Sequence, residues 1–198
     1  RRSLAVEDAA GTVIAALVVL AAMVGVVGAN ATYMNTTSED QKELLQWAQP
    51  NNDLKGTLAD VEAVSRHNEG EDVLFFGTCN PGGNQCDRSD PGDALFYVKD
   101  ESSLDRMPPG GPAWHSRLPL PWYLESYGAN VTSSHPNAST ETVLDDAPPV
   151  VVAYRWNASD VEPHLDGYAK REHAFKLWGE HVVIFIDESA LREARAAG

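Results

Sequence analysis

The sequence predicts an α/β protein in which one transmembrane helix precedes a layered α/β domain with a partly parallel sheet. The 30 residues from Ala9 to Ser38 contain no Asp, Glu, Lys or Arg, although 22% of the chain is charged. The residues that follow are acidic and polar, and they suffice for one globular domain with a core. Short apolar runs alternate there with amphipathic segments, which is typical of helices layered on a sheet.

The apolar segment predicts a membrane-spanning helix. Its central part, Gly11–Ala29, would measure roughly 28 Å as a helix, close to the hydrocarbon thickness of a bilayer. A cleaved signal peptide is the alternative, because Ala29-Asn30-Ala31 has the form of a processing site. We prefer the span, because the run exceeds the roughly 7–15 residues of a signal core and because Glu7 and Asp8 precede it.

Two arginines at the start set the expected orientation. Arg1 and Arg2 place the N-terminal flank in the cytoplasm by the positive-inside tendency. We therefore expect a cytoplasmic flank at 1–8, a transmembrane helix at 9–31 and an exterior α/β domain at 32–198, on the extracellular side of the cell membrane. The chain lacks an initiator Met, and we expect it to be part of a longer protein whose last span begins here, although processing also removes a Met.

The asparagines support an exported surface. Five of the ten lie in N-x-[ST] glycosylation sequons. These are Asn30, Asn35, Asn130, Asn137 and Asn157. Such an excess favours a glycan-bearing exterior domain, although sequons also arise by accident.

The helices that open the domain are predicted from their caps. Ser38–Ala48 begins with a capping-box pattern and is stopped by Pro50. Thr57 is expected to cap a second helix that runs to about His67. The apolar side of this second helix carries Leu58, Val61 and Val64.

Helices and buried strands then alternate. The runs Asp72–Gly77 and Val150–Tyr154 are short, apolar and bounded by turn residues, so we expect buried strands. Pro119–Tyr127 is a short amphipathic helix, and Thr140–Asp145 is a helical turn. Ser159 and Glu162 are then expected to cap a helix that ends at about Asp166.

Two further strands are expected near the C-terminus. Glu172–Trp178 and His181–Ile186 are separated by Gly179 and Glu180, a spacing that allows a C-terminal hairpin. The stretch from Thr78 to Pro112 has no regular pattern and is long for a compact domain, so it is either a functional loop or an insertion.

The two cysteines predict a small disulfide-closed loop. Cys79 and Cys86 bracket a Pro-Gly-Gly turn, and an oxidising exterior would let them pair. Two free thiols are the alternative. A metal site is less favoured, because two thiolates without a nearby His or second Cys pair do not supply four ligands.

The charge excludes nucleic acid as a partner. The formal net charge is −14, from 29 acidic and 15 basic residues. A phosphate backbone is bound by clustered Lys and Arg, which this surface lacks. Self-repulsion of this size is tolerated at high salt, so the composition suggests a halophilic source.

No specific catalytic motif is present. The nucleophile-elbow, zinc-protease and phosphate-loop patterns are all missing. The six histidines show no ligand spacing, and we expect each to be a surface or rim residue. Asp145-Asp146 and Asp187-Glu188 are expected on a solvated acidic face, with paired carboxylates as the alternative. We expect no catalytic residue, metal or cofactor in this part; a divalent cation stays open.

The segment Pro112–Tyr127 departs from ordinary surface composition. Its candidate ligand-binding residues are Trp114, His115, Arg117, Trp122 and Tyr123. Aromatic rings cover apolar sugar faces, and a guanidinium binds anionic oxygens bidentately, so the group suits a sugar or a phosphate. The alternative is that these aromatic residues pack a helix against the sheet.

A family resemblance rests on that segment and a few others. The residues that carry it are Gln49-Pro50, Asp53-Leu54, the run Trp114 to Glu125, Gly128-Ala129 and Pro148 to Val152. In these the chain resembles the C-terminal region of a haloarchaeal membrane protein family. The family is named for association with flippase activity and is akin to the dolichyl-phosphate-mannose-type (GT-C) membrane glycosyltransferases.

The resemblance implies a polytopic protein of the N-glycosylation pathway that handles polyprenyl-phosphate-linked sugars. Its implied partners are membrane lipid, a lipid-linked saccharide and other spans of the same protein. Enzymes of this type keep their catalytic acid in an early external loop, so no catalytic residue is transferred to this chain.

We therefore expect the exterior C-terminal domain of a GT-C-like protein that transfers or flips lipid-linked sugar. The alternative is a single-span glycosylated cell-surface protein that binds a partner or forms part of the envelope, without enzymatic activity. A free-standing exterior hydrolase is a third, weaker candidate. The length of the reading frame separates the first two.

Overall fold

The computed structural model describes residues 2–29, 53–79, 94–98, 111–175 and 180–197, with backbone alone at 2–12, 27–29, 111 and 112. The chain divides into two compact units, Arg1–Trp47 and Ala48–Gly198. The predicted helix Ser38–Ala48, the sequon residues Asn30 and Asn35, and Cys86 lie outside the described residues.

The first unit contains helix α1, Arg2–Ala29, which begins before the predicted span at 9–31. All its described side chains, 13–26, are exposed, and they include bulky apolar residues such as Val18, Leu20 and Val24. Among the described residues, no helix has the combined length and apolarity that crossing a membrane requires. The predicted transmembrane helix therefore stays a prediction.

The second unit is built on a five-stranded mixed sheet with the order β2-β1-β3-β5-β4. Its strands are β1 (Val73–Phe75), β2 (Val131–Ser133), β3 (Val150–Tyr154), β4 (Tyr168–Phe175) and β5 (Glu180–Asp187). Strand β1 pairs in parallel with both β2 and β3, whereas β5 is antiparallel to β3 and β4. The partly parallel sheet and the antiparallel C-terminal strand pair are confirmed.

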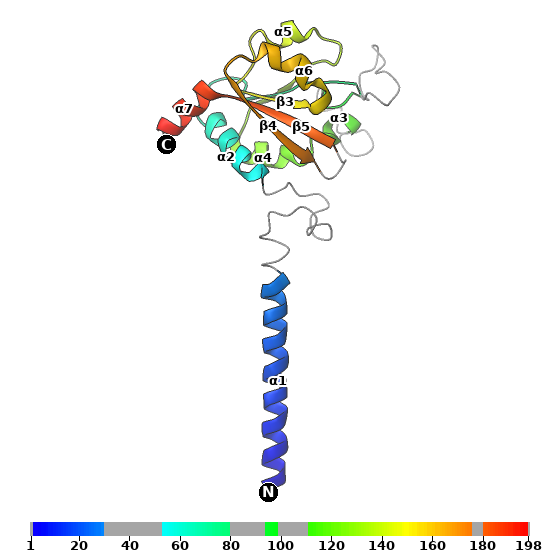
Figure 1. Ribbon diagram of the computed structural model, residues 1–198, viewed down its shortest axis with the longest axis vertical. Helices are drawn as coiled ribbons and strands as arrows, with labels where there is room; N and C mark the ends of the chain where they lie inside the picture. The colour runs from blue at the N-terminus through cyan, green and yellow to red at the C-terminus, as the bar shows by residue number, and fades with distance from the viewer. Residues whose placement is uncertain (1, 30–52, 80–93, 99–110, 176–179, 198) are drawn as a thin grey trace. The chain divides into compact units, whose positions relative to one another are not determined.

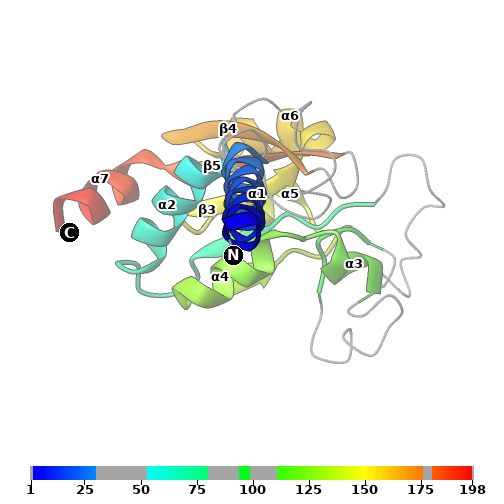
Figure 2. The same cartoon turned by 90° about the horizontal axis from the view of Figure 1, so that it is seen from below.

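Helices cover both faces of this sheet, as Figure 1 shows. The face seen in Figure 2 carries α2 (Leu54–Ser65), α4 (Leu120–Tyr127) and α7 (Glu188–Ala197). The opposite face carries α5 (Thr140–Leu144) and α6 (Ala158–Val161). Three short helices, α3 (Gly111–His115), η5 (Arg155–Asn157) and η6 (Glu162–His164), lie in the connections.

Successive side chains along a strand point to opposite faces of the sheet, and this alternation divides the core into two clusters. In β3, Val150, Val152 and Tyr154 join the cluster beneath α2, α4 and α7, whereas Val151 and Ala153 join the cluster beneath α5 and α6. Every residue of β3 is buried. Because both faces are covered, a central strand can be apolar throughout. The sequence therefore predicts β1 and β3 from their continuous apolar runs.

Two predicted helix starts are wrong. Helix α2 begins at Leu54, and its N-cap is Asp53 rather than Thr57, which is buried inside the helix. Ser159 and Glu162 do not open one helix, because Ser159 lies within α6 and Glu162 opens η6. Pro163 has no N–H group to donate to a helical hydrogen bond, which agrees with the two short helices, α6 and η6, in this segment.

Helix α7 was not predicted. It follows β5 directly, and the Asp187 carboxylate caps it by accepting from the Ser189 and Ala190 N–H groups. Asp187 therefore caps a helix end, while the predicted solvated acidic face at Asp187-Glu188 stays a prediction.

Part of the irregular stretch from Thr78 to Pro112 belongs to the core. Ala94 and Phe96 are fully buried, and Thr78 forms an isolated bridge with Leu95. Phe96 has a φ of 67°, a left-handed conformation that is uncommon for an aromatic residue. Its ring packs edge-on against Phe75 and stacks on Tyr154, so burial of the ring holds this backbone conformation.

Candidate functional site

The structure divides the five predicted ligand residues between different environments. Trp114 on α3 and Arg117 line a small hollow, whereas Trp122 on α4 is 78% exposed. Tyr123 is partly buried and packs against the core, and His115 is partly buried on α3. Of the predicted group, Trp114 and Arg117 line the hollow, whereas His115, Trp122 and Tyr123 do not. A ligand-binding role for the five residues stays a prediction.

Arg117 is buried, with 7% of its surface exposed. Its Nε donates to the Phe96 carbonyl at 2.9 Å, and its Nη2 donates to the same oxygen. The guanidinium lies 4.4 Å from the centroid of the Phe75 ring, a cation–π contact. The neighbouring Ser116 Oγ accepts from the Phe96 N–H at 2.9 Å, so Ser116 and Arg117 together hold both backbone groups of Phe96.

Arg117 has no acidic partner within ion-pair distance in the described part of the chain. Burial lowers the pKa of its guanidinium to about 10, so the side chain stays protonated at neutral pH. A buried cation held by a carbonyl and a ring retains attraction for an anion.

The hollow beside Arg117 is small and mixed in character. Its volume is about 80 Å³, and it is lined by Phe75, Trp114, Arg117, Pro121, Leu124, Glu125 and Val131. Phe75 and Leu124 are buried, whereas Glu125 is exposed. The hollow thus has an apolar wall, a cationic group and a carboxylate.

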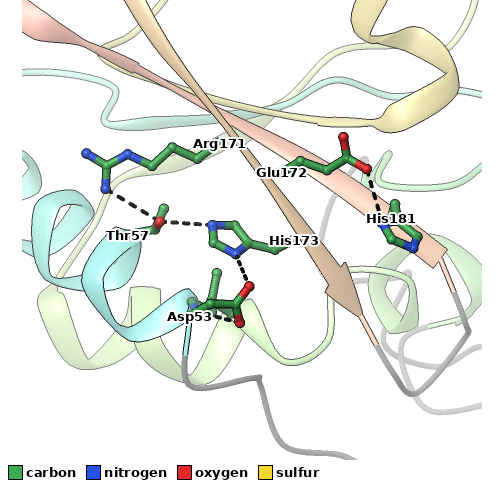
Figure 3. A network of polar contacts seen from close by, with 7 residues as sticks. Asp53, Thr57, Arg171, Glu172, His173 and His181 are labelled. Carbon is green, nitrogen blue, oxygen red and sulfur yellow. Dashed lines mark hydrogen bonds and ion pairs between the residues drawn. The ribbon is translucent and has the colours of Figure 1, made fainter. Parts of the chain in front are cut away.

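A second polar cluster joins α2 to β4 (Figure 3). His173 is 6% exposed, its Nε2 lies 2.9 Å from Thr57 Oγ1 and its Nδ1 lies 3.3 Å from Asp53 Oδ2. The Arg171 guanidinium is 3.5 Å from the same Thr57 oxygen. The prediction that every histidine is a surface or rim residue is wrong for His173.

The order Asp53, His173, Thr57 has the form of an acid, base and hydroxyl relay. Thr57 is only 2% exposed, however, so its hydroxyl cannot reach a substrate. The cluster therefore fixes α2 on the sheet. The cluster is recognised by the burial of His173 within β4. A single sequence does not reveal this burial, so the cluster could not be predicted.

Ion pairs extend this cluster to α7. Asp60 on α2 receives the Arg171 guanidinium at 2.6 Å and that of Arg195 at 2.7 Å. On the other side of β4, Glu172 pairs with Arg155 at 3.3 Å and with His181 at 3.1 Å. These contacts join α2, β4, α7, η5 and β5, and none of them includes Arg117.

The three described sequons differ in access. Asn137 is exposed in a turn. Asn130 is exposed, but its side-chain amide donates to the Gly70 carbonyl at 2.9 Å. Asn157 is partly buried, and its Oδ1 has no hydrogen-bond partner among the described residues. Cys79 is disulfide-bonded; its pairing with Cys86 stays a prediction.

Comparison with known proteins identifies the family. No curated protein and no solved structure matches the chain. The model of the Agl23 flippase-associated protein C-terminal domain matches residues 54–187, from the first residue of α2 to the last of β5. Because this match covers more than half of the chain and agrees with the resemblance seen in the sequence, the chain belongs to the Agl23 flippase-associated protein family through its C-terminal domain.

Proposed function

We propose that residues 32–198 form the exterior domain of a polytopic GT-C-like membrane protein that handles polyprenyl-phosphate-linked sugars in protein N-glycosylation. The family match over residues 54–187 carries this proposal. The uncharged stretch Ala9–Ser38 supports a transmembrane helix at 9–31, and the sequons support an extracellular domain.

The domain is proposed to present aromatic and cationic side chains to the carrier or its sugar. Arg117 and Trp114 supply a cation and a ring at one hollow. Trp122 exposes a second ring on α4, and an exposed indole suits the apolar face of a sugar. The domain would then assist transfer or flipping, with the chemistry performed by other parts of the longer protein.

A deletion in the host cell tests this role. The complete reading frame is replaced by one that lacks residues 54–198, and protein glycans and lipid-linked sugars are measured by mass spectrometry. We expect protein N-glycans to fall and lipid-linked sugar to accumulate. Detection of the truncated protein in membranes is the control. An unchanged glycan profile would contradict the proposal and favour the alternative, a glycosylated cell-surface binding protein.

A further inference from the structure

The hollow beside Arg117, here called the Arg117 pocket, has features expected of an oxyanion-binding site. Charged groups buried in proteins are normally paired with an opposite charge. Arg117 is more than nine-tenths buried, lines the pocket and forms no ion pair with a described residue. An anion in the pocket would supply the missing charge.

The guanidinium is already oriented for such a ligand. Nε and Nη2 are held on the Phe96 carbonyl, and the Phe75 ring supports the plane of the group. The two N–H groups of Nη1 donate to no described residue. Because the side chain is fixed by packing, binding costs little side-chain entropy.

The size and rim of the pocket restrict the ligand. A volume of about 80 Å³ holds several water-sized atoms at about 10–15 Å³ each, enough for a phosphate group but too little for a sugar ring as well. Glu125 also lines the pocket. Its carboxylate opposes a second negative charge and accepts hydrogen bonds from hydroxyl groups, while Trp114 offers an apolar face.

These features favour a ligand with one anionic group beside a hydroxyl-bearing ring. We infer that the Arg117 pocket binds the phosphate group of a sugar phosphate, with Arg117 on the phosphate and Glu125 and Trp114 beside the sugar. The assignment of a lipid-linked source rests on the proposed function. The phosphate site itself rests on the pocket alone.

Titration calorimetry of the full chain in detergent micelles tests the pocket, at constant ionic strength, with inorganic phosphate, glucose 1-phosphate and glucose as probes. We expect glucose 1-phosphate to bind more tightly than inorganic phosphate, and glucose to show no measurable binding. Arg117→Gln should weaken binding of glucose 1-phosphate about tenfold or more, because a charge-assisted pair is lost. Unchanged binding by this variant, with its near-ultraviolet circular dichroism preserved, would overturn the site.

Variants at the rim of the pocket test phosphate binding even if Arg117→Gln does not fold. Glu125→Gln should tighten inorganic phosphate binding about threefold or more by removing a nearby like charge. Glu141→Gln on α5 is the matched control, because it removes the same charge from an exposed position that does not line the pocket. Equal affinities for Glu125→Gln and Glu141→Gln would refute the site.

The aromatic wall has its own matched pair. Trp114→Ala should weaken binding of glucose 1-phosphate about threefold or more, because the ring covers the sugar. Tyr168→Ala should leave this affinity unchanged, since Tyr168 packs on the core cluster at the opposite face of the sheet and does not line the pocket. Equal effects of the two variants would overturn the placement of the sugar beside Trp114.

A final binding experiment distinguishes failure of this inference from failure of the proposed function. Polyprenyl phosphoglucose in micelles is compared with glucose 1-phosphate. Arg117-dependent binding of both supports the lipid-linked source. Binding of glucose 1-phosphate alone rejects that source and retains a phosphate site, whereas normal glycans in cells that lack residues 54–198 would reject the cellular role without removing the site.

Discussion

Arg117 makes its hydrogen bonds to a backbone carbonyl of a segment that lies 21 positions earlier in the sequence. The sequence marked Arg117 as unusual because aromatic residues surround it, and the structure does bring Trp114 to the same hollow. The sequence does not reveal that the Phe96 carbonyl is the hydrogen-bond partner of Arg117. Phe96 lies in a stretch without periodicity, and its burial depends on contacts with Phe75 and Tyr154, which are distant in sequence.

Gly77 and Gly56 form a contrasting pair. A Cβ at Gly77 would lie 2.1 Å from the Ser134 backbone oxygen, whereas a Cβ at Gly56, in the exposed part of α2, meets nothing within 4 Å. Gly77→Ala should lower the free energy of unfolding by about 2 kcal/mol or more through overpacking. Gly56→Ala should raise it by about 0.5–1 kcal/mol, because alanine favours the helix. Urea unfolding followed by tryptophan fluorescence measures both, and equal effects would contradict the predicted clash.

Thr57 tests the buried cluster. Thr57→Val keeps the shape of the side chain but leaves His173 Nε2 without its hydroxyl partner. An unsatisfied buried group costs about 1–3 kcal/mol, so the free energy of unfolding should fall by that amount. Thr142→Val, at an exposed position of α5, is the control and should change it by less than about 0.5 kcal/mol. Similar losses for both variants would show that the Thr57 hydroxyl contributes nothing specific.

At the scale of elements, burial on both faces decides what could be predicted. Strand β3 was predicted with its observed bounds, because five consecutive buried residues give an apolar run. Strand β2 has only partly buried residues and lies at a sheet edge, so it has no such run. The predicted start of α2 is misplaced because Asp53 and Thr57 are both good capping residues. In the structure Asp53 is the cap, and Thr57 is buried inside the helix, where its hydroxyl contacts His173.

Helix α7 depends on its cap. Burial opposes ionisation of Asp187, but hydrogen bonds from the Ser189 hydroxyl and from the Ala190 and Ser189 N–H groups, together with Arg192, hold its pKa below the usual value. Asp187→Ala should lower the free energy of unfolding by about 1 kcal/mol at pH 7, as expected for loss of an N-cap.

The pH dependence of this variant gives a second check. A depressed pKa stabilises the fold above the unfolded-state pKa of about 3.9, and that stability is lost as pH falls through the lower folded-state pKa. The difference between wild type and Asp187→Ala should therefore shrink below about pH 4. A difference that stays constant from pH 7 to pH 3, in denaturant titrations, would exclude the charged cap as its cause.

At the scale of the whole molecule, net charge opposes compaction. The formal charge is −14 at pH 7. Salt shortens the screening length from about 10 Å at 0.1 M to about 3 Å at 1 M, so the unfolding temperature should rise over this range of potassium chloride. Near pH 4.7, the isoelectric point of the sequence, the net charge vanishes and the gain should largely disappear. An equal gain at both pH values would point to salt effects on apolar burial instead.

The central position of β1 has a consequence for chain synthesis. Its two neighbours are β2 and β3, and its first residue, Val73, pairs with Val131 and Val150. A ribosome that has released β1 must therefore synthesise the chain as far as Ser133 before this strand can pair with β2, and as far as Tyr154 before it can pair with β3. The β4–β5 pair, in contrast, joins residues as near as Phe175 and Glu180 and can form as soon as it emerges. The nascent domain thus keeps an unpaired apolar strand until β2 has been translated, and chaperones that shield such strands would act on it during that interval.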